Sequence, residues 1–333
     1  MSARPILSVE GLSKQFVLRS EGFGVPPRTV QAVSNVSLDL GEGHTLGIVG
    51  ESGCGKSTTA RLLMGLIRPD AGSIRLDGRE IDRSARGLTE FRRYVQMVFQ
   101  DSSASLNPRL TIEASVMFGP MVHGVARPAA RAIAHRLLDR VGLEPMRFAG
   151  RYPHELSGGQ RQRVNIARAL ALEPRIVIFD EAVSALDKSI EAQVLNLLLD
   201  LKADLKLSYI FISHDLNVVR YISDDVLVMY LGEVVEYGPA ASIYARPTHP
   251  YTRALLASMP SLDPDRRTTA PPITGDPPSP IEPPPGCRFH TRCALADEVC
   301  RSAKPASSSC GAQHFGSCHM LDPRSGHRQA GQP

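Results

Sequence analysis

The chain has 333 residues, of which 42% are hydrophobic and 22% are charged, and its formal net charge is +4. These values are typical of a globular protein, and they exclude a wholly disordered chain and argue against a dedicated nucleic-acid binder with a clustered basic face. No run reaches the roughly 20 apolar residues of a membrane-spanning helix, and the amino-terminal apolar stretch is too short for a signal peptide, so we expect a cytosolic protein.

The first elements are predicted to be strands, because residues 6–18 and 29–40 carry apolar side chains at near-alternate positions. Residues 44–50 (HTLGIVG) form a short apolar strand that runs into a glycine-rich turn, and residues 56–67 are typical of a helix. A further strand is predicted to end at Gln100. From about residue 110 to residue 170 the pattern is helical.

A second stretch of alternating strands and helices follows. Residues 175–181 (RIVIFDE) and 207–215 (LSYIFISHD) are predicted to be buried strands, residues 189–205 an amphipathic helix, and residues 224–238 a strand pair around Gly232. The overall pattern indicates an α/β fold.

The last third changes in composition. Nine prolines between Pro264 and Pro285 predict a stiff, extended linker over residues 261–285. Five of the six cysteines crowd residues 286–320, and we expect the polar tail of residues 321–333 to be disordered.

Residues 50–57 read GESGCGKS and fit the phosphate-loop pattern G-x-x-x-x-G-K-[ST], with an apolar strand before them and a helix after them. Backbone N–H groups of such a loop wrap phosphates, Lys56 supplies a cation to the β and γ phosphates, and the Ser57 hydroxyl can ligate Mg²⁺. The alternative is a glycine-rich turn with a chance lysine, which the flanking strand and helix disfavour.

A phosphate loop needs a carboxylate on the metal side, and the apolar strand IVIF ends in Asp180 and Glu181. We predict that Asp180 holds Mg²⁺ through water and that Glu181 polarises the attacking water. Alone, such a pair is more often structural or caps a helix.

The segment LSGGQRQR (residues 156–163) resembles the signature motif of ABC ATPases. The resemblance covers about residues 5–260 and implies an ABC-type nucleotide-binding domain: a RecA-like core, a β-subdomain and a helical signature subdomain at about 110–170. It also implies ATP and Mg²⁺ as ligands and a head-to-tail dimer. In that dimer, Ser157, Gly158, Gly159 and Gln160 face the γ-phosphate of the partner's ATP.

Other positions receive roles from the same resemblance. Gln100 is similar to the Q-loop glutamine that senses Mg²⁺ and the attacking water, and His214 to the switch histidine; with Glu181 they form the predicted catalytic set. Ser184 and Asp187 resemble the D-loop. Phe16 is the aromatic expected to stack on adenine, with a core role as the alternative. The remaining ATP-binding residues implied are Gly50, Ser52, Gly53, Cys54, Gly55, Lys56, Ser57 and Thr58.

Several stretches, including FQDSSASLNPRLTI, RYPHELSGGQRQR and HPYTRALL, resemble the dipeptide and oligopeptide permease branch, and an insertion near residues 22–28 resembles its second ATPase. The branch implies two membrane permeases, a paralogous ATPase (or a homodimer), an extracytoplasmic solute-binding protein, and a peripheral place at the cytoplasmic face of the inner membrane. Import of nickel chelates or glutathione is an alternative cargo. A soluble non-transport ABC ATPase is the alternative class.

The terminal cysteines lack the tight CxxC spacing of common zinc sites. Four thiolates can hold a 4Fe–4S cluster or zinc, and a segment without metal is the third alternative. The family resemblance implies the cluster, with Cys287, Cys293, Cys300 and Cys318 as ligands and Cys310 as the extra cysteine. Its expected role is to staple a segment too small to fold alone.

Overall fold

The computed structural model describes residues 4–18, 27–259, 273 and 275–331. The predicted insertion near residues 22–28 and the first half of the predicted linker lie largely outside these residues. The chain divides into two compact units, which are described separately. The first consists of Met1–Leu40, Leu46–Glu80 and His214–Pro333, and the second of Gly41–Thr45 and Ile81–Ser213.

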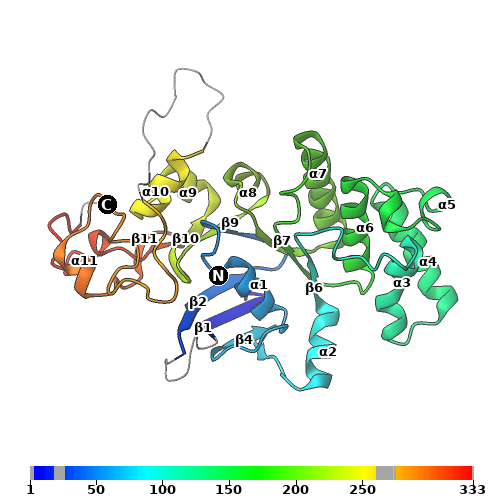
Figure 1. Cartoon of the computed structure of the whole chain (residues 1–333), viewed down its shortest axis with the longest axis horizontal. Helices are drawn as coiled ribbons and strands as arrows, with labels where there is room; N and C mark the ends of the chain where they lie inside the picture. The colour runs from blue at the N-terminus through cyan, green and yellow to red at the C-terminus, as the bar shows by residue number, and fades with distance from the viewer. Residues whose placement is uncertain (1–3, 19–26, 260–272, 274, 332–333) are drawn as a thin grey trace. The chain divides into compact units, whose positions relative to one another are not determined.

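The first unit opens with an antiparallel sheet (Figure 1). Its strand order is β2-β1-β4-β5, and its alternating apolar side chains, such as Val9, Leu38 and Ile74, are buried on one face. The strands are β1 (Leu7–Val17), β2 (Thr29–Leu40), β4 (Ala71–Leu76) and β5 (Arg79–Glu80). The predicted strands at 6–18 and 29–40 are therefore confirmed.

The same unit contains β3 (Thr45–Val49), which pairs in parallel with β9 (Asp225–Tyr230). All five residues of β3 are buried, as the apolar run predicts for a strand covered on both faces. Strand β9 turns back into β10 (Glu233–Pro239) around Gly232, which confirms the predicted strand pair. The helices here are α1 (Lys56–Leu63), α8 (Leu216–Ile222), α9 (Ala240–Ala245) and α10 (Pro250–Ala257).

The carboxy-terminal segment, residues 286–320, packs on β10 within the first unit (Figure 1). It contains α11 (Glu298–Ser302), β11 (Ser308–Gly311), β12 (His314–Gly316) and the 3-10 helix η3 (His319–Leu321). Strand β12 pairs antiparallel with β10, so the segment extends the sheet edge. Residues 275–285 carry no helix or strand.

The tail differs from the expected disorder as far as Gly331. His327 is buried and its Nε2 lies 3.0 Å from the carbonyl oxygen of Leu295, while the Arg328 amide donates to Asp297 at 2.8 Å. Polar composition suggested a solvated tail, but these polar groups find partners in the segment that precedes them.

The second unit holds parallel strands in the order β8-β7-β6, with bounds β6 (Val95–Val98), β7 (Ile176–Asp180) and β8 (Ser208–Ile212). Strands β7 and β8 are buried throughout, as their continuous apolar runs predict. The predicted helix at 189–205 is α7 (Lys188–Leu205), and α2 (Ala85–Tyr94) precedes β6.

Every element between residues 112 and 170 is helical, as predicted (Figure 1). These are α3 (Ile112–Val122), α4 (Arg127–Arg140), α5 (Pro145–Phe148), the 3-10 helix η1 (Pro153–Glu155) and α6 (Gly158–Leu170). None of the helices in the described ranges is long and apolar enough to cross a membrane.

Candidate nucleotide site

The phosphate loop, residues 50–57, runs from buried β3 into α1. At Gly55 the backbone φ is +106°, and an added Cβ would lie 2.3 Å from the carbonyl oxygen of Ala32 on β2. Only glycine fits both the backbone angle and this close approach. The neighbouring strand therefore explains why the second glycine of the motif is needed where it stands.

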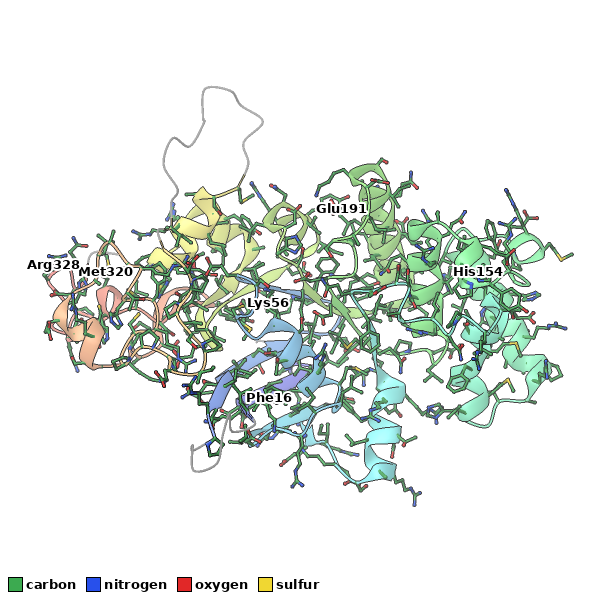
Figure 2. All side chains as sticks on the ribbon, viewed as in Figure 1. Phe16, Lys56, His154, Glu191, Met320 and Arg328 are labelled. Atoms are coloured by element: carbon green, nitrogen blue, oxygen red, sulfur yellow. The ribbon has the colours of Figure 1, made fainter. Side chains whose placement is uncertain are left out.

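Lys56 begins α1 (Figure 2), and its side chain is buried, with only 4% exposed. Its ammonium donates to the carbonyl oxygens of Gly50 at 2.7 Å and Glu51 at 2.9 Å. The cation is thus held inside the loop by neutral acceptors. Phosphate oxygens are charged acceptors and make stronger hydrogen bonds with an ammonium, so the loop is suited to exchange these carbonyls for an anion.

In the second unit, Asp180 ends β7 with only 5% of its surface exposed, and Glu181 follows in the left-handed region at φ +49°. The Glu181 amide donates to the carbonyl oxygen of Ile212 at 2.9 Å, and the Ser184 hydroxyl donates to the Glu181 carbonyl oxygen at 2.9 Å. These hydrogen bonds hold Glu181 in a backbone conformation that is strained for a residue with a Cβ. Such fixed strain is typical of functional positions.

The Glu181 carboxylate has a partner on the predicted Q-loop. The Gln100 side-chain amide donates to its Oε2 at 2.9 Å, although the two residues stand 81 positions apart. Gln100 follows β6 and Glu181 follows β7, which are adjacent parallel strands, so both side chains emerge at the same carboxyl edge. The structure therefore brings together two residues that the sequence assigned to the same chemistry.

The signature residues begin α6. The Ser157 hydroxyl accepts from the Gln160 amide at 3.3 Å, and the Gln160 side chain accepts from the Ser157 amide at 3.0 Å. This reciprocal capping box fixes the first turn of the helix. An added Cβ at Gly159 would lie 2.5 Å from Cγ2 of Ile190 on α7, so the second glycine also permits helix packing.

The other predicted residues fall at element ends or on the surface. Asp187 precedes α7 as its N-cap, and His214 is an exposed residue just before α8. Phe16 lies on β1 with 37% of its surface exposed and the Lys14 ammonium 5.6 Å from its ring centroid (Figure 2). The alternative core role for Phe16 is therefore wrong, while its contact with adenine stays a prediction.

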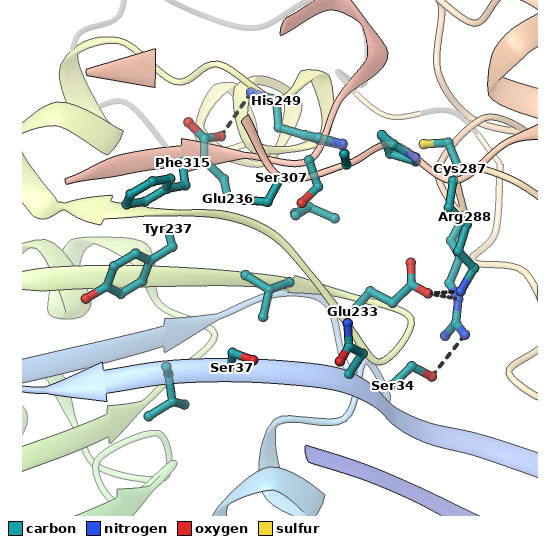
Figure 3. Close-up of a pocket in the computed structure, with 18 of the residues that line it drawn as sticks. Ser34, Ser37, Glu233, Glu236, Tyr237, His249, Cys287, Arg288, Ser307 and Phe315 are labelled. Atoms are coloured by element: carbon teal, nitrogen blue, oxygen red, sulfur yellow. Dashed lines mark hydrogen bonds and ion pairs between the residues drawn. The ribbon is translucent and has the colours of Figure 1, made fainter. Parts of the chain in front are cut away.

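The carboxy-terminal segment is anchored by Arg288, whose side chain is 4% exposed (Figure 3). Its guanidinium pairs with Glu233 at 3.0 Å and donates to Ser34 at 3.0 Å and to the carbonyl oxygen of Leu231. Arg288, Glu233 and Ser34 line a pocket of about 660 Å³ between β1, β2, β10 and the segment. Because partners on β2 and β10 hold its guanidinium, Arg288 anchors the segment to these strands.

The four cysteines singled out by the sequence line one small pocket in this segment: Cys287, Cys293, Cys300 and Cys318. Cys310 lies apart, with its sulfur 3.7 Å from the Thr248 hydroxyl oxygen. Burial raises the pKa of Cys287 to about 12 and that of Cys318 to about 11, so these two thiols are protonated at neutral pH.

The donor chemistry of this pocket fits a thiolate-bound metal, because four cysteines line it. Metal binding would have to displace the thiol protons. The geometry is not that of a formed site, since no group of three or more His, Cys, Asp or Glu side chains in the described ranges is arranged to hold a metal ion.

Three residues near the phosphate loop had no predicted role: Glu51, Tyr251 and Arg292. The Glu51 amide donates to the Tyr251 hydroxyl oxygen at 2.9 Å, and Arg292 pairs with the Glu51 carboxylate. Tyr251 belongs to HPYTRALL, one of the stretches that resemble the peptide permease branch, and Arg292 belongs to the cysteine-rich segment. Their contact with the loop has no local sequence signal, because 241 residues separate Arg292 from Glu51.

The phosphate loop, the strand-end carboxylates and the capped signature helix define an ABC-type ATPase. The family model "ABC transporter" matches residues 33–184, and the model "Oligopeptide/dipeptide transporter, C-terminal region" matches residues 235–300. The first covers the phosphate loop, Gln100, the signature residues and the strand-end carboxylates, and the second reaches the beginning of the carboxy-terminal segment.

Relatives extend the match over nearly the whole chain. The oligopeptide transport ATP-binding protein AppF of Bacillus subtilis is 47% identical over 324 residues, covering 95% of this chain and 97% of AppF. OppF of Salmonella typhimurium, also an oligopeptide transport ATP-binding protein, is 46% identical over 326 residues, covering 96% and 97%. The solved structure of cbiO1 from Clostridium perfringens, part of the ABC transporter complex cbiONQ, has a TM-score of 0.63 at 29% identity, covering 73% of this chain and 92% of cbiO1. The chain belongs to the ATP-binding subunits of the oligopeptide/dipeptide ABC transporter family.

Proposed function

We propose that this chain binds and hydrolyses ATP to drive the import of dipeptides or oligopeptides through two membrane permeases. The observation that carries the proposal is the coincidence of an intact phosphate loop, a Gln100–Glu181 pair and a carboxy-terminal region of the peptide-transporter type. The relatives named for oligopeptide transport match 95% and 96% of the chain, which supports the same role for both parts.

Each predicted site residue keeps a distinct role in the proposed hydrolysis. Lys56 would neutralise the β and γ phosphates, and Ser57 and Asp180 would hold Mg²⁺, which would supply charge stabilisation when bound. Glu181 orients the attacking water, and the hydrogen bond from Gln100 fixes its carboxylate. Phosphoryl transfer to water needs no covalent intermediate, so position and charge are sufficient.

The remaining roles concern the nucleotide and the partner proteins. We propose that His214 contacts the γ-phosphate and that Phe16 stacks on adenine. Ser157 to Gln160, with the D-loop residues Ser184 and Asp187, would act across a dimer with a paralogous ATPase or a second copy. A solute-binding protein outside the membrane would deliver the peptide. The subunit would sit at the cytoplasmic face of the membrane, held by the permeases.

The experiment that tests this function is uptake of labelled dipeptides and oligopeptides by the source cell, with and without the gene. We expect uptake to fall on deletion and to return with the intact gene but not with Lys56→Ala. Unchanged peptide uptake would contradict peptide import, and uptake of nickel chelates and glutathione would then be measured.

We further propose that Cys287, Cys293, Cys300 and Cys318 bind a 4Fe–4S cluster, supported by their gathering at one pocket and by the separate position of Cys310. The group would staple a small segment to the sheet. Iron and acid-labile sulfide are measured on anaerobically purified protein, with Cys310→Ser as the matched control for Cys300→Ser. The proposal requires that Cys300→Ser lose both and Cys310→Ser keep both; sulfide-free wild-type protein would refute it.

A further inference from the structure

The phosphate loop is held from outside by the carboxy-terminal segment. Arg292 forms a two-pronged ion pair with Glu51, the second residue of the loop, with Nη1 2.7 Å from Oε2 and Nη2 3.0 Å from Oε1. The backbone of Glu51 is held as well, since its amide donates to the Tyr251 hydroxyl oxygen at 2.9 Å. One loop residue is therefore fixed at both its side chain and its main chain.

This ion pair is largely removed from water. The side chains of Arg292 and Glu51 are 7% and 24% exposed, and Tyr251 is fully buried. The Arg292 guanidinium also donates to the Tyr230 hydroxyl at 3.3 Å, and Tyr230 packs against Tyr251 with ring centroids 4.6 Å apart. Bidentate pairs in such surroundings are directional and strong, and removing one partner leaves the other charge buried.

Glu51 also binds the lysine of the phosphate loop. The carbonyl oxygen of Glu51 accepts from the Lys56 ammonium at 2.9 Å, so a rotation of Glu51 would displace the cation that is to meet the phosphates. Arg292, Glu51 and Lys56 thus form a continuous chain of contacts from the segment into the loop. A displacement of Arg292 would therefore be passed through Glu51 to the Lys56 ammonium.

Arg292 is in turn fixed by its place in the segment. It directly precedes Cys293, which lines the cysteine pocket, and its amide donates to the carbonyl oxygen of Phe289 at 3.0 Å. Phe289 packs edge-on against Tyr230 and Tyr251, at centroid distances of 5.2 and 5.4 Å. The backbone that carries Arg292 therefore belongs to a packed turn, which restricts where the guanidinium can lie.

We infer that Arg292 is a positioning residue for the phosphate loop, and that the carboxy-terminal segment sets the affinity for ATP through its contact with Glu51. This inference rests on the proposed ATPase function. The Arg292–Glu51 ion pair, here called the clamp, holds the loop in one conformation before the nucleotide binds. Without the clamp the loop must become ordered on binding, which costs conformational entropy. Loss of the clamp weakens ATP binding and raises KM more than it lowers kcat.

The test is equilibrium titration of the full-length protein with a fluorescent ATP analogue and Mg²⁺, followed by steady-state ATPase kinetics. Arg292→Ala and Glu51→Gln are each expected to weaken binding about tenfold, which corresponds to a small fraction of a typical nucleotide-binding free energy. Arg292→Lys keeps the charge but not the fork and should recover part of the affinity. The double variant should bind no more weakly than the worse single variant, because both remove one interaction.

The matched control is Lys304→Ala, which removes an exposed ion pair between the same segment and Glu233 at 2.7 Å but leaves the Arg288–Glu233 pair and the contact of Arg292 with the loop in place. It should leave ATP affinity unchanged. If Arg292→Ala does not fold, Glu51→Gln carries the test, since it keeps the loop backbone. Wild-type protein that binds ATP while Glu51→Gln binds equally well or more tightly overturns the clamp, whereas wild-type protein that binds no ATP overturns the proposed function.

Discussion

Acid should loosen the contact between α10 and the phosphate loop through His249. This residue is the N-cap of α10 and is 1% exposed, and its Nδ1 accepts from the Tyr251 amide at 3.0 Å. Burial is the main cause that lowers the pKa of His249 to about 4, with Arg253 also lowering it and Glu236 opposing the shift. A protonated Nδ1 has no lone pair, so protonation also breaks the helix cap.

The size of the effect follows from the two pKa values. The folded state binds the proton at about pH 4 and the unfolded chain at about 6.5, so the stabilising contribution is complete above pH 6.5 and is lost as pH falls towards 4. Between pH 7 and pH 5 the free energy of unfolding should decrease by about 2 kcal/mol through this residue alone.

Urea unfolding followed by circular dichroism at pH 7 and pH 5 measures this change, with His249→Asn as the comparison. Asparagine can still cap the helix but does not titrate, so the variant should show a pH dependence smaller by about 2 kcal/mol, whatever its stability at pH 7. Equal pH dependence in both proteins would refute the reasoning. A His249 signal titrating near 6.5 in NMR spectra of the folded protein would do the same.

Three further outcomes test the site. Glu181→Gln should retain ATP binding and lose at least about 100-fold of the ATPase rate in single-turnover assays, because the amide cannot polarise water as the carboxylate does. Gly55→Ala should abolish binding of a fluorescent ATP analogue, because the added Cβ would lie 2.3 Å from a backbone oxygen and the residue has φ +106°. In thermal unfolding, Gly159→Ala should destabilise the chain by about 1–3 kcal/mol, since it meets Ile190 at 2.5 Å, whereas Gly158→Ala, with its nearest neighbour at 3.8 Å, should change stability by less than about 1 kcal/mol.

The motifs can be predicted because each depends on residues that lie close together in the sequence. An apolar run that ends in a carboxylate pair becomes a buried strand with its charges at the edge, and β7 does so at Asp180. Capping is equally local: Ser157 and Gln160 stand three residues apart, and their reciprocal hydrogen bonds follow from that spacing. Strand periodicity and helix caps therefore place most of the predicted residues.

What the sequence could not supply are contacts between distant segments. The exposure of Phe16 depends on which face of β1 is covered near its end, and alternation alone left core and surface equally open. The buried tail residue His327 was expected to be solvated, because a polar composition does not reveal a carbonyl partner 32 residues away. The pair of Arg292 with Glu51 has the same character over a much longer separation.

The carboxy-terminal segment supports the nucleotide loop at more than one point. Arg288 donates to the carbonyl oxygen of Leu231, and the next residue, Gly232, donates its amide to the carbonyl oxygen of Cys54 within the loop at 2.8 Å. Arg292 reaches the loop directly at Glu51.

Two arginines four positions apart thus brace the loop, one through the β9–β10 turn and one by contact. A segment so small gains little from apolar burial, and these two ion pairs add to its packing against the sheet. Because each anchor ends at the loop or at its immediate neighbour, the folding of the segment and the geometry of the phosphate loop are thermodynamically linked.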